Sequence, residues 1–237
     1  MSFISIDFAL FVTLALILYY ILPKKCQWIV LLVASYAFYA QSGSGDLVYI
    51  IITTVTTFIC AAFIEKKTGD QNRYLTDNKE SLTKEDKKTY KAGVKKQQRR
   101  ILLAGLFINF GILIYLKYAN ISIAYFNLYR LKWTGNTDFV PFIRVLLPLG
   151  ISFYTFQTMG YLIDIYYGKY KREKNLFRFA LYVSFFPQIV QGPISRFGQI
   201  APTLYAEKRF DFARIRSGFY RIIWGLFKKL VIADRLS

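Results

Sequence analysis

The chain has 237 residues, of which 54% are hydrophobic, yet its formal net charge is +18 and it contains no histidine. Its hydrophobic and basic residues form separate alternating blocks, which is typical of a protein that crosses a membrane several times. This pattern argues against a nucleic-acid partner, because a soluble basic protein would lack apolar stretches long enough to span a bilayer.

The first apolar block, Phe8 to Leu22, lies between Asp7 on one side and Lys24 and Lys25 on the other. It has no basic segment before it and no small-residue cleavage site after it. The block is therefore predicted to be a retained span and not a signal peptide. Its charge asymmetry predicts that the N-terminus lies outside and Lys24 inside.

The second block, Trp28 to Ala40, is short for a span of about 20 residues. A re-entrant or in-plane helix is therefore an alternative to a crossing. The charge pattern favours a crossing, since residues 42–46 would then lie outside without a Lys or Arg, and the third block, Leu47 to Ile64, would return the chain to the cytoplasm.

The basic segment 65–100 follows, with 12 Lys or Arg against 6 Asp or Glu, a net charge of +6. We expect a cytoplasmic loop that contacts anionic lipid head groups or, as the alternative, binds a partner. Within it, residues 81–87 are typical of a capped and solvated helix start.

A fourth block, Ile101 to Leu116, is predicted to cross outward again. Residues 117–144 would then form an outside loop or an interfacial helix, rich in aromatic side chains such as Trp133. The fifth block, Val145 to Tyr167, would return the chain to the inside, where the basic loop Lys169 to Lys174 follows it.

Polar side chains inside the fifth block are expected either to pack helices together or to face a cavity or partner. Small ones are expected to pack helices together: Ser152, Thr155 and Thr158. Gln157 and Asp164 are candidates for facing a cavity or a partner, because amide and ionisable groups at membrane depth seldom face lipid. As an alternative, Asp164 lies at the water interface and pairs with Lys169 or Arg172.

The sixth block, residues 179–196, is predicted to be a broken helix that re-enters the cytoplasmic side. Proline and a Gly-Pro pair interrupt the helix, and a full crossing would leave the many cations that follow on the outside. Non-helical backbone at this depth must be buried in protein or line a watery cavity. The candidate lining residues are Pro187, Gln188, Gln191, Gly192, Pro193 and Arg196.

The last segment, residues 217–237, repeats apolar residues at helical spacing and places basic residues off that stripe. It is predicted to be an amphipathic helix in the inner interface or, equally, an ordinary helix that covers part of the protein. The predicted fold is all-α and polytopic, a single membrane domain over residues 1–237 with about five spans, a re-entrant hairpin and this amphipathic helix.

Four motifs, in this order and spacing, resemble the membrane-bound O-acyltransferase (MBOAT) family, most closely its bacterial alginate O-acetylation branch. They are residues 147–157 (LPLGISFYTFQ), 164–167 (DIYY), 185–194 (FFPQIVQGPI) and 224–234 (WGLFKKLVIAD). The resemblance covers nearly the whole chain but corresponds to the N-terminal half of a typical member.

The resemblance implies an all-helical ring around a thinned membrane centre in a bacterial cell membrane. It implies an enzyme that takes an acyl group, usually acetyl, from a cytoplasmic donor, either acetyl-CoA or another acyl carrier. The acceptor would be a hydroxyl of an exported polysaccharide or cell-envelope glycan, reached directly or through a partner acetyltransferase on the outer side. The family's catalytic histidine lies in a downstream Trp-His stretch, so no catalytic residue is assigned within residues 1–237.

We therefore expect a fragment whose missing C-terminal half is a further partner, and we do not expect this chain to catalyse alone. Acyl transfer to an alcohol needs a general base near neutral pKa, and histidine is the natural choice.

Cys26 and Cys60 are expected to be free and inert, and no metal-ligand spacing is found. Arg196 is expected to meet a donor phosphate. The alternatives are a noncatalytic scaffold for a glycan-acylation complex and a small transporter.

Overall fold

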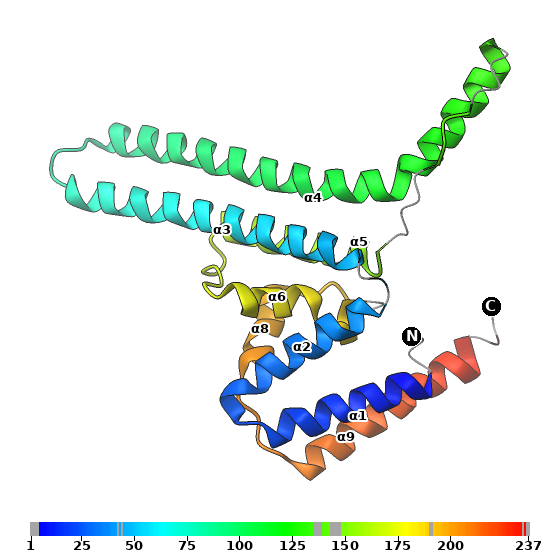
Figure 1. Ribbon diagram of the computed structural model, residues 1–237. Coiled ribbons are helices and arrows are strands. Elements are labelled where there is room, and N and C mark those ends of the chain that lie inside the picture. The colour runs from blue at the N-terminus through cyan, green and yellow to red at the C-terminus, as the bar shows by residue number, and fades with distance from the viewer. Residues whose placement is uncertain are drawn as a thin grey trace.

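The computed structural model describes residues 5–41, 43, 45–134, 139–142, 148–189, 192–233 and 235. Every regular element among these residues is a helix, and none of them forms a strand, which confirms the all-α prediction. Two long helices form an arm at one side, and shorter helices pack beneath it (Figure 1).

The first two helices form a V. Helix α1 (Ile6–Ile21) begins at Ser5, whose hydroxyl accepts a hydrogen bond from the Phe8 amide at 3.2 Å. A short 3₁₀ turn (Lys24–Cys26) then leads into α2 (Gln27–Ala40). These helices have 16 and 14 residues, which correspond to about 24 and 21 Å. Both are shorter than the hydrocarbon core of about 30 Å, so five spans remain a prediction.

Helices α3 (Asp46–Asp77) and α4 (Lys84–Thr134) are the long antiparallel pair (Figure 1). Among the described residues, they are the two helices long and apolar enough to cross a membrane. The basic segment 65–100 is not an irregular loop: it consists of the end of α3, a turn and the start of α4. We call it the basic hairpin.

The sequence correctly predicts a capped helix start in this hairpin. The Thr83 amide and hydroxyl donate to the Asp86 carboxylate at 3.2 and 2.6 Å, and the Asp86 amide donates back to the Thr83 hydroxyl at 3.2 Å. These reciprocal bonds satisfy amides that the first turn of a helix leaves free. The Tyr74 and Tyr90 rings stack across the two arms, with centroids 4.3 Å apart.

Helix α4 continues through residues 117–134, where the sequence predicts a loop or a separate interfacial helix. Lys117 ends the apolar block, but no proline or glycine lies between Lys117 and Thr134 to end the helix there. Residues 139–142 fold back against it, since the Asn127 side chain exchanges two hydrogen bonds with the Val140 backbone, at 2.9 and 3.0 Å. Residues 143–147, where the fifth apolar block begins, lie outside the described part.

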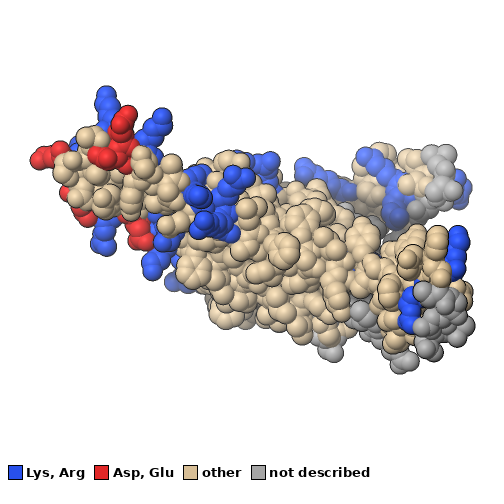
Figure 2. All heavy atoms as spheres, turned by 90° about the horizontal axis from the view of Figure 1, so that it is seen from above, with Lys and Arg blue, Asp and Glu red and all other residues tan. Residues whose placement is uncertain are grey.

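Charge is distributed unevenly along the molecule. The face in Figure 2 shows mixed basic and acidic residues at the free end of the basic hairpin, a broad region nearly free of charge, and basic residues again at the far end. An uncharged middle between charged ends is expected for a protein embedded in a bilayer. Membrane localisation follows from this distribution and from the two long apolar helices.

Helix α5 (Ile151–Tyr166) packs against both long helices. The approach is close at Gly105 of α4, where a Cβ atom would lie 2.8 Å from Leu162 Cδ2 and 3.0 Å from Cys60 Sγ. Asn109 Nδ2 donates to Thr57 Oγ1 at 3.0 Å across the α3–α4 contact, and both residues are buried. Small residues and interhelical hydrogen bonds of this kind hold membrane helices together.

The remaining helices are short, except the last. The sixth apolar block forms α6 (Leu176–Ser184) and α7 (Phe186–Ile189), and α8 (Phe197–Tyr205) follows. Helix α9 (Phe212–Phe227), which starts five residues before the predicted range, continues into a π-helical turn (Lys228–Ala233).

Helix α9 runs antiparallel to α1 and beside it (Figure 1). The Tyr20 and Phe210 rings meet edge to face with centroids 5.3 Å apart, and an apolar groove of about 550 Å³ lies between the two helices. The structure thus places α9 beside α1, and its position in the inner interface stays a prediction.

Candidate functional site

The predicted break in the sixth block is present. Helix α6 ends at Ser184 because Phe185 leaves the helical conformation, with ψ of 105°. In a continuous helix, the ring of Pro187 would clash with the carbonyl of Val183 four residues before it. In the structure Pro187 instead lies in the first turn of α7, where its missing amide proton costs nothing. Pro187 and Pro193 are both exposed.

The tip of this hairpin, residues 185–189, is held at the N-terminal end of α5. Gly150 has φ of 67° and lies so close to Ile189 that a Cβ atom would overlap the Ile189 carbonyl. From α2, the Ser35 hydroxyl accepts a hydrogen bond from the Phe186 amide at 3.2 Å. The Tyr39 hydroxyl donates to the Leu149 carbonyl at 2.8 Å. Helices α2 and α5 therefore fix where α6 stops.

Gln157, one of the candidate residues, supports the break. Its Nε2 donates to the Tyr182 carbonyl at 3.0 Å, and the side chain is buried. The last carbonyls of a helix have no partner within it, so an amide from a neighbouring helix replaces the bond that an unbroken α6 would have made. The neighbouring Thr155 and Thr158 are fully buried, as expected for helix packing.

The return segment is tied to the hairpin through Ser195. Gln188 Nε2 donates to Ser195 Oγ at 2.8 Å, and the Tyr182 hydroxyl donates to the Ser195 carbonyl at 3.1 Å. The Gly192 amide donates to the Gln188 carbonyl at 2.9 Å, which closes the turn. Candidate residue Gln191 lies outside the described residues.

Asp164 joins three segments at the other end of α5. Only 4% of this residue is exposed, yet its Oδ1 lies 2.7 Å from Lys169 Nζ and 3.7 Å from Arg196 Nη1. The Tyr170 hydroxyl donates to its Oδ2 at 3.1 Å. The carboxylate thus holds the C-terminal end of α5, the basic loop and the end of the return segment together. We call these four residues the Asp164 cluster.

The sequence reading of Asp164 is correct for one of its two proposed partners. Lys169 pairs with it, whereas Arg172 pairs with Glu65 of α3 at 2.8 Å. Tyr170 was not predicted as a partner, because a tyrosine in a basic loop carries no signal that it points back to a helix end.

These contacts show that the sixth block folds back on itself. Its tip lies beside Gly150 and its end at Asp164, so the chain leaves and returns at the same end of α5. Lys169 and Arg196 place fixed positive charge where the hairpin ends, which suits an anionic ligand. Among the described residues there is no group of three or more His, Cys, Asp or Glu that could hold a metal ion. With no histidine in the sequence, the site lacks the usual general base.

Comparison with known proteins gives close sequence relatives. The chain is 32% identical over 231 residues to the protein named "Probable alginate O-acetylase AlgI" of Pseudomonas syringae pv. tomato, covering 96% of this chain and 39% of the relative. The proteins of the same name from Pseudomonas putida and Pseudomonas aeruginosa are 32% and 31% identical over 231 residues, again over 96% of this chain, with 41% and 39% of the relatives covered.

The chain is similar to proteins named as probable alginate O-acetylases. It spans about two fifths of the length of these relatives. A "Peptidoglycan O-acetyltransferase" of Helicobacter pylori is also similar, with 30% identity over 166 residues, covering 59% of this chain and 30% of that protein. No protein-family model matches the chain, and no solved structure matches it. The resemblance to membrane-bound O-acyltransferases is thereby confirmed.

The surroundings of Tyr170 predict that the folded protein loses stability at high pH. Burial, reinforced by the charge of Asp164, raises the pKa of Tyr170 far above the unfolded value of about 10. The folded protein therefore keeps a proton that the unfolded chain releases, so the Tyr170 contribution is complete below pH 10 and is lost as the pH rises above it. The Tyr170→Phe variant should show a flatter fall in melting temperature between pH 9.5 and 11 than the wild type. Equal slopes would contradict this role.

Proposed function

We propose that this chain forms part of a membrane-bound O-acyltransferase that transfers acetyl groups to hydroxyls of an exported polysaccharide or another cell-envelope glycan. The observation that carries the proposal is the similarity to proteins named alginate O-acetylases along 96% of the chain. The re-entrant hairpin supports it, since a broken helix with polar groups suits a path through the membrane for a polar substrate.

The donor in this proposal is acetyl-CoA or another acyl carrier, used as a cosubstrate. The guanidinium of Arg196 binds a phosphate group of this donor. The Arg196 side chain is 63% exposed and lies 3.7 Å from Asp164, whose charge is already balanced by Lys169 at 2.7 Å. Arg196 can therefore turn to an incoming anion without leaving the buried carboxylate unpaired.

Replacing Arg196 tests this role. In a full-length relative carrying this segment, Arg196→Ala should raise the KM for the donor about tenfold with little change in kcat, because a phosphate contact far from the reacting atoms contributes uniform binding. Arg209→Ala, which removes another exposed cation, is the control. A donor KM unchanged by Arg196→Ala would show that Arg196 does not bind the donor.

The general base is proposed to be a histidine supplied by the remaining length of such an enzyme, since this chain has none. Purified chain, and the chain joined to that remaining length, would be incubated with radiolabelled acetyl-CoA and a polysaccharide acceptor. We expect acetyl transfer only from the joined protein. Transfer by neither would favour the scaffold reading, and solute uptake by vesicles containing the chain would favour the transporter.

We further propose a multi-pass arrangement in the bacterial plasma membrane, with the N-terminus outside and the basic hairpin in the cytoplasm. The excess of cations on the hairpin supports this orientation. In a variant without Cys26 and Cys60, a cysteine at Ser81 should react with a membrane-impermeant maleimide only in inverted vesicles, and one at Gln41 only in right-side-out cells. The reverse labelling would overturn the orientation.

A further inference from the structure

The two long faces of α9 differ in chemistry. One face carries Ile215, Gly218, Phe219 and Ile222, which line the apolar groove shared with α1. The other face is hollowed by a groove of about 570 Å³, lined by Phe212, Ala213, Arg216, Ser217, Tyr220, Arg221 and Trp224. We call this second surface the α9 cationic face. Every described residue of α9 is at least partly exposed, so no other part of the described chain covers this face.

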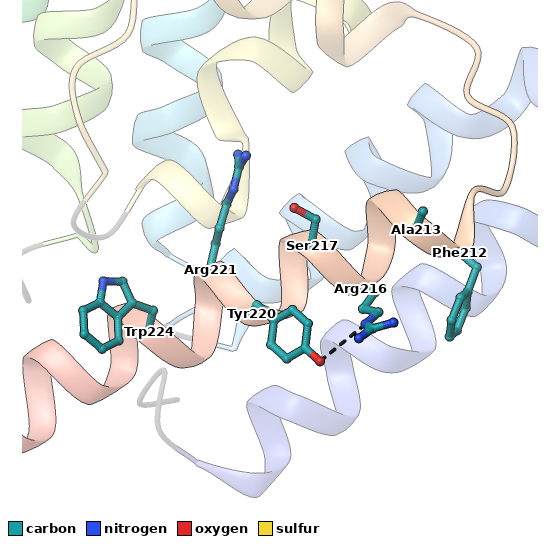
Figure 3. A pocket seen from close by; sticks show the side chains of 7 residues that line it. All are labelled: Phe212, Ala213, Arg216, Ser217, Tyr220, Arg221 and Trp224. Atoms are coloured by element: carbon teal, nitrogen blue, oxygen red, sulfur yellow. Dashed lines mark hydrogen bonds between the residues drawn. The ribbon is translucent and has the colours of Figure 1, made fainter.

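Two arginines flank this groove. Figure 3 shows Arg216 and Tyr220 on one side of the helix and Arg221 and Ser217 on the other, with Trp224 and Phe212 towards the two ends. Arg216 Nε donates to the Tyr220 hydroxyl at 3.4 Å, and its guanidinium lies 5.5 Å from the Tyr220 ring centre. Among the described residues, neither arginine has a carboxylate within 4 Å.

These arginines lie at the level of an apolar helix. The groove on the opposite face of α9 is shared with Thr13 to Ile21 of α1, a stretch without charged residues. If α1 crosses the bilayer, Arg216 and Arg221 lie at membrane depth, where a cation exposed to lipid is costly and is found facing protein, water or an opposite charge.

We propose that the α9 cationic face is the docking surface for a membrane-embedded helix that carries carboxylates. A helix laid in the groove would have a cation on each flank and aromatic rings at the two ends of the contact, so its Asp or Glu side chains would meet Arg216 and Arg221. The alginate O-acetylase relatives are longer than this chain, and their additional length is the first place to look for such a helix. The proposal does not depend on the acyl-transfer chemistry.

The test uses the whole chain in phosphatidylcholine vesicles, with Trp28→Phe and Trp133→Phe so that Trp224 is the only tryptophan. The probe is a dansyl-labelled transmembrane peptide of leucine and alanine with two glutamates one helical turn apart near its centre. Energy transfer from Trp224 reports binding. We expect the Glu peptide to bind about tenfold more tightly than the same peptide with glutamines, as interhelical polar contacts in membranes allow.

Variants locate the effect. Arg216→Gln with Arg221→Gln should abolish the preference for the Glu peptide, and the matched pair Lys117→Gln with Lys132→Gln on α4 should keep it. Arg216→Lys with Arg221→Lys, which keeps both charges, should also keep most of it, and this separates loss of charge from misfolding.

Three results would overturn the proposal. The first is equal binding of the Glu and Gln peptides. The second is loss of Glu-peptide binding when phosphatidylglycerol replaces phosphatidylcholine, which would assign the face to lipid head groups. The third is efficient crosslinking of two chains through Ser217→Cys, which would assign the face to a second copy.

Discussion

Replacing Gly150 by alanine is expected to lower the stability of the protein by about 3 kcal/mol or more. Gly150 has φ of 67°, in the left-handed region that an alanine enters only with strain, and its added Cβ would overlap the Ile189 carbonyl. Because both are backbone positions, the clash is relieved only by moving α7 away from the start of α5. Thermal unfolding in detergent, followed by circular dichroism, measures the loss.

An alanine substitution at a second glycine separates the backbone strain from the overlap with Ile189. Gly168 has nearly the same φ, 70°, but nothing lies within 4 Å of the Cβ that alanine would add. Gly168→Ala should therefore cost only the backbone strain, about 1 kcal/mol, and the difference between the two variants measures the overlap at Ile189. Equal melting temperatures for the two variants would show that the hairpin tip does not press against Gly150.

Removing the carboxylate of Asp164 is expected to have the next largest effect, a loss of about 2 kcal/mol. The residue is 4% exposed and is shared by Lys169, Tyr170 and Arg196. The cost lies below the range for a fully buried ion pair because the Lys169 and Arg196 side chains are 47% and 63% exposed and regain water.

Three variants separate the contributions of the individual Asp164 contacts to stability. Asp164→Ala removes all contacts, Asp164→Asn keeps an acceptor for the Tyr170 hydroxyl, and Asp211→Asn disrupts an exposed pair at 3.8 Å as a control. We expect the loss of melting temperature to decrease in that order, with almost none for Asp211→Asn. Faster tryptic cleavage after Arg196 in Asp164→Ala would show that the end of the hairpin is released. An unchanged cleavage rate would mean that other contacts hold it.

The sequence predicted the elements that depend on local chemistry. Pro187 strongly disfavours a continuous helix through the middle of the sixth block, so the break there was predictable. The capped start at Thr83 depends on three neighbouring residues and was predictable for the same reason. The re-entrant path rested on charge balance and stays a prediction; the contact between Arg196 and Asp164 shows that the chain folds back to the end of α5.

Features that depend on distant contacts were not predictable. Hydropathy ends a block at the first charges, so it could not show that α4 continues through Lys117 to Thr134. The cap that Gln157 provides for Tyr182 requires knowing that α5 and α6 are neighbours. A periodic stripe in α9 predicts a helix but not the element it lies against, and only the structure places α1 there.

The two arms of the basic hairpin are bound to each other, and the hairpin is bound near its base to α5. Its arms are joined by the stacked Tyr74 and Tyr90 rings and by Gln98, whose amide donates to the Ile64 carbonyl and the Thr68 hydroxyl at 3.2 and 2.8 Å. Near the base, Lys95 Nζ donates to the Tyr166 carbonyl at the end of α5, at 2.7 Å, two residues after Asp164. Tilting the tip of the basic hairpin would therefore displace the end of α5. Through Asp164, it would also displace Arg196 at the end of the sixth block.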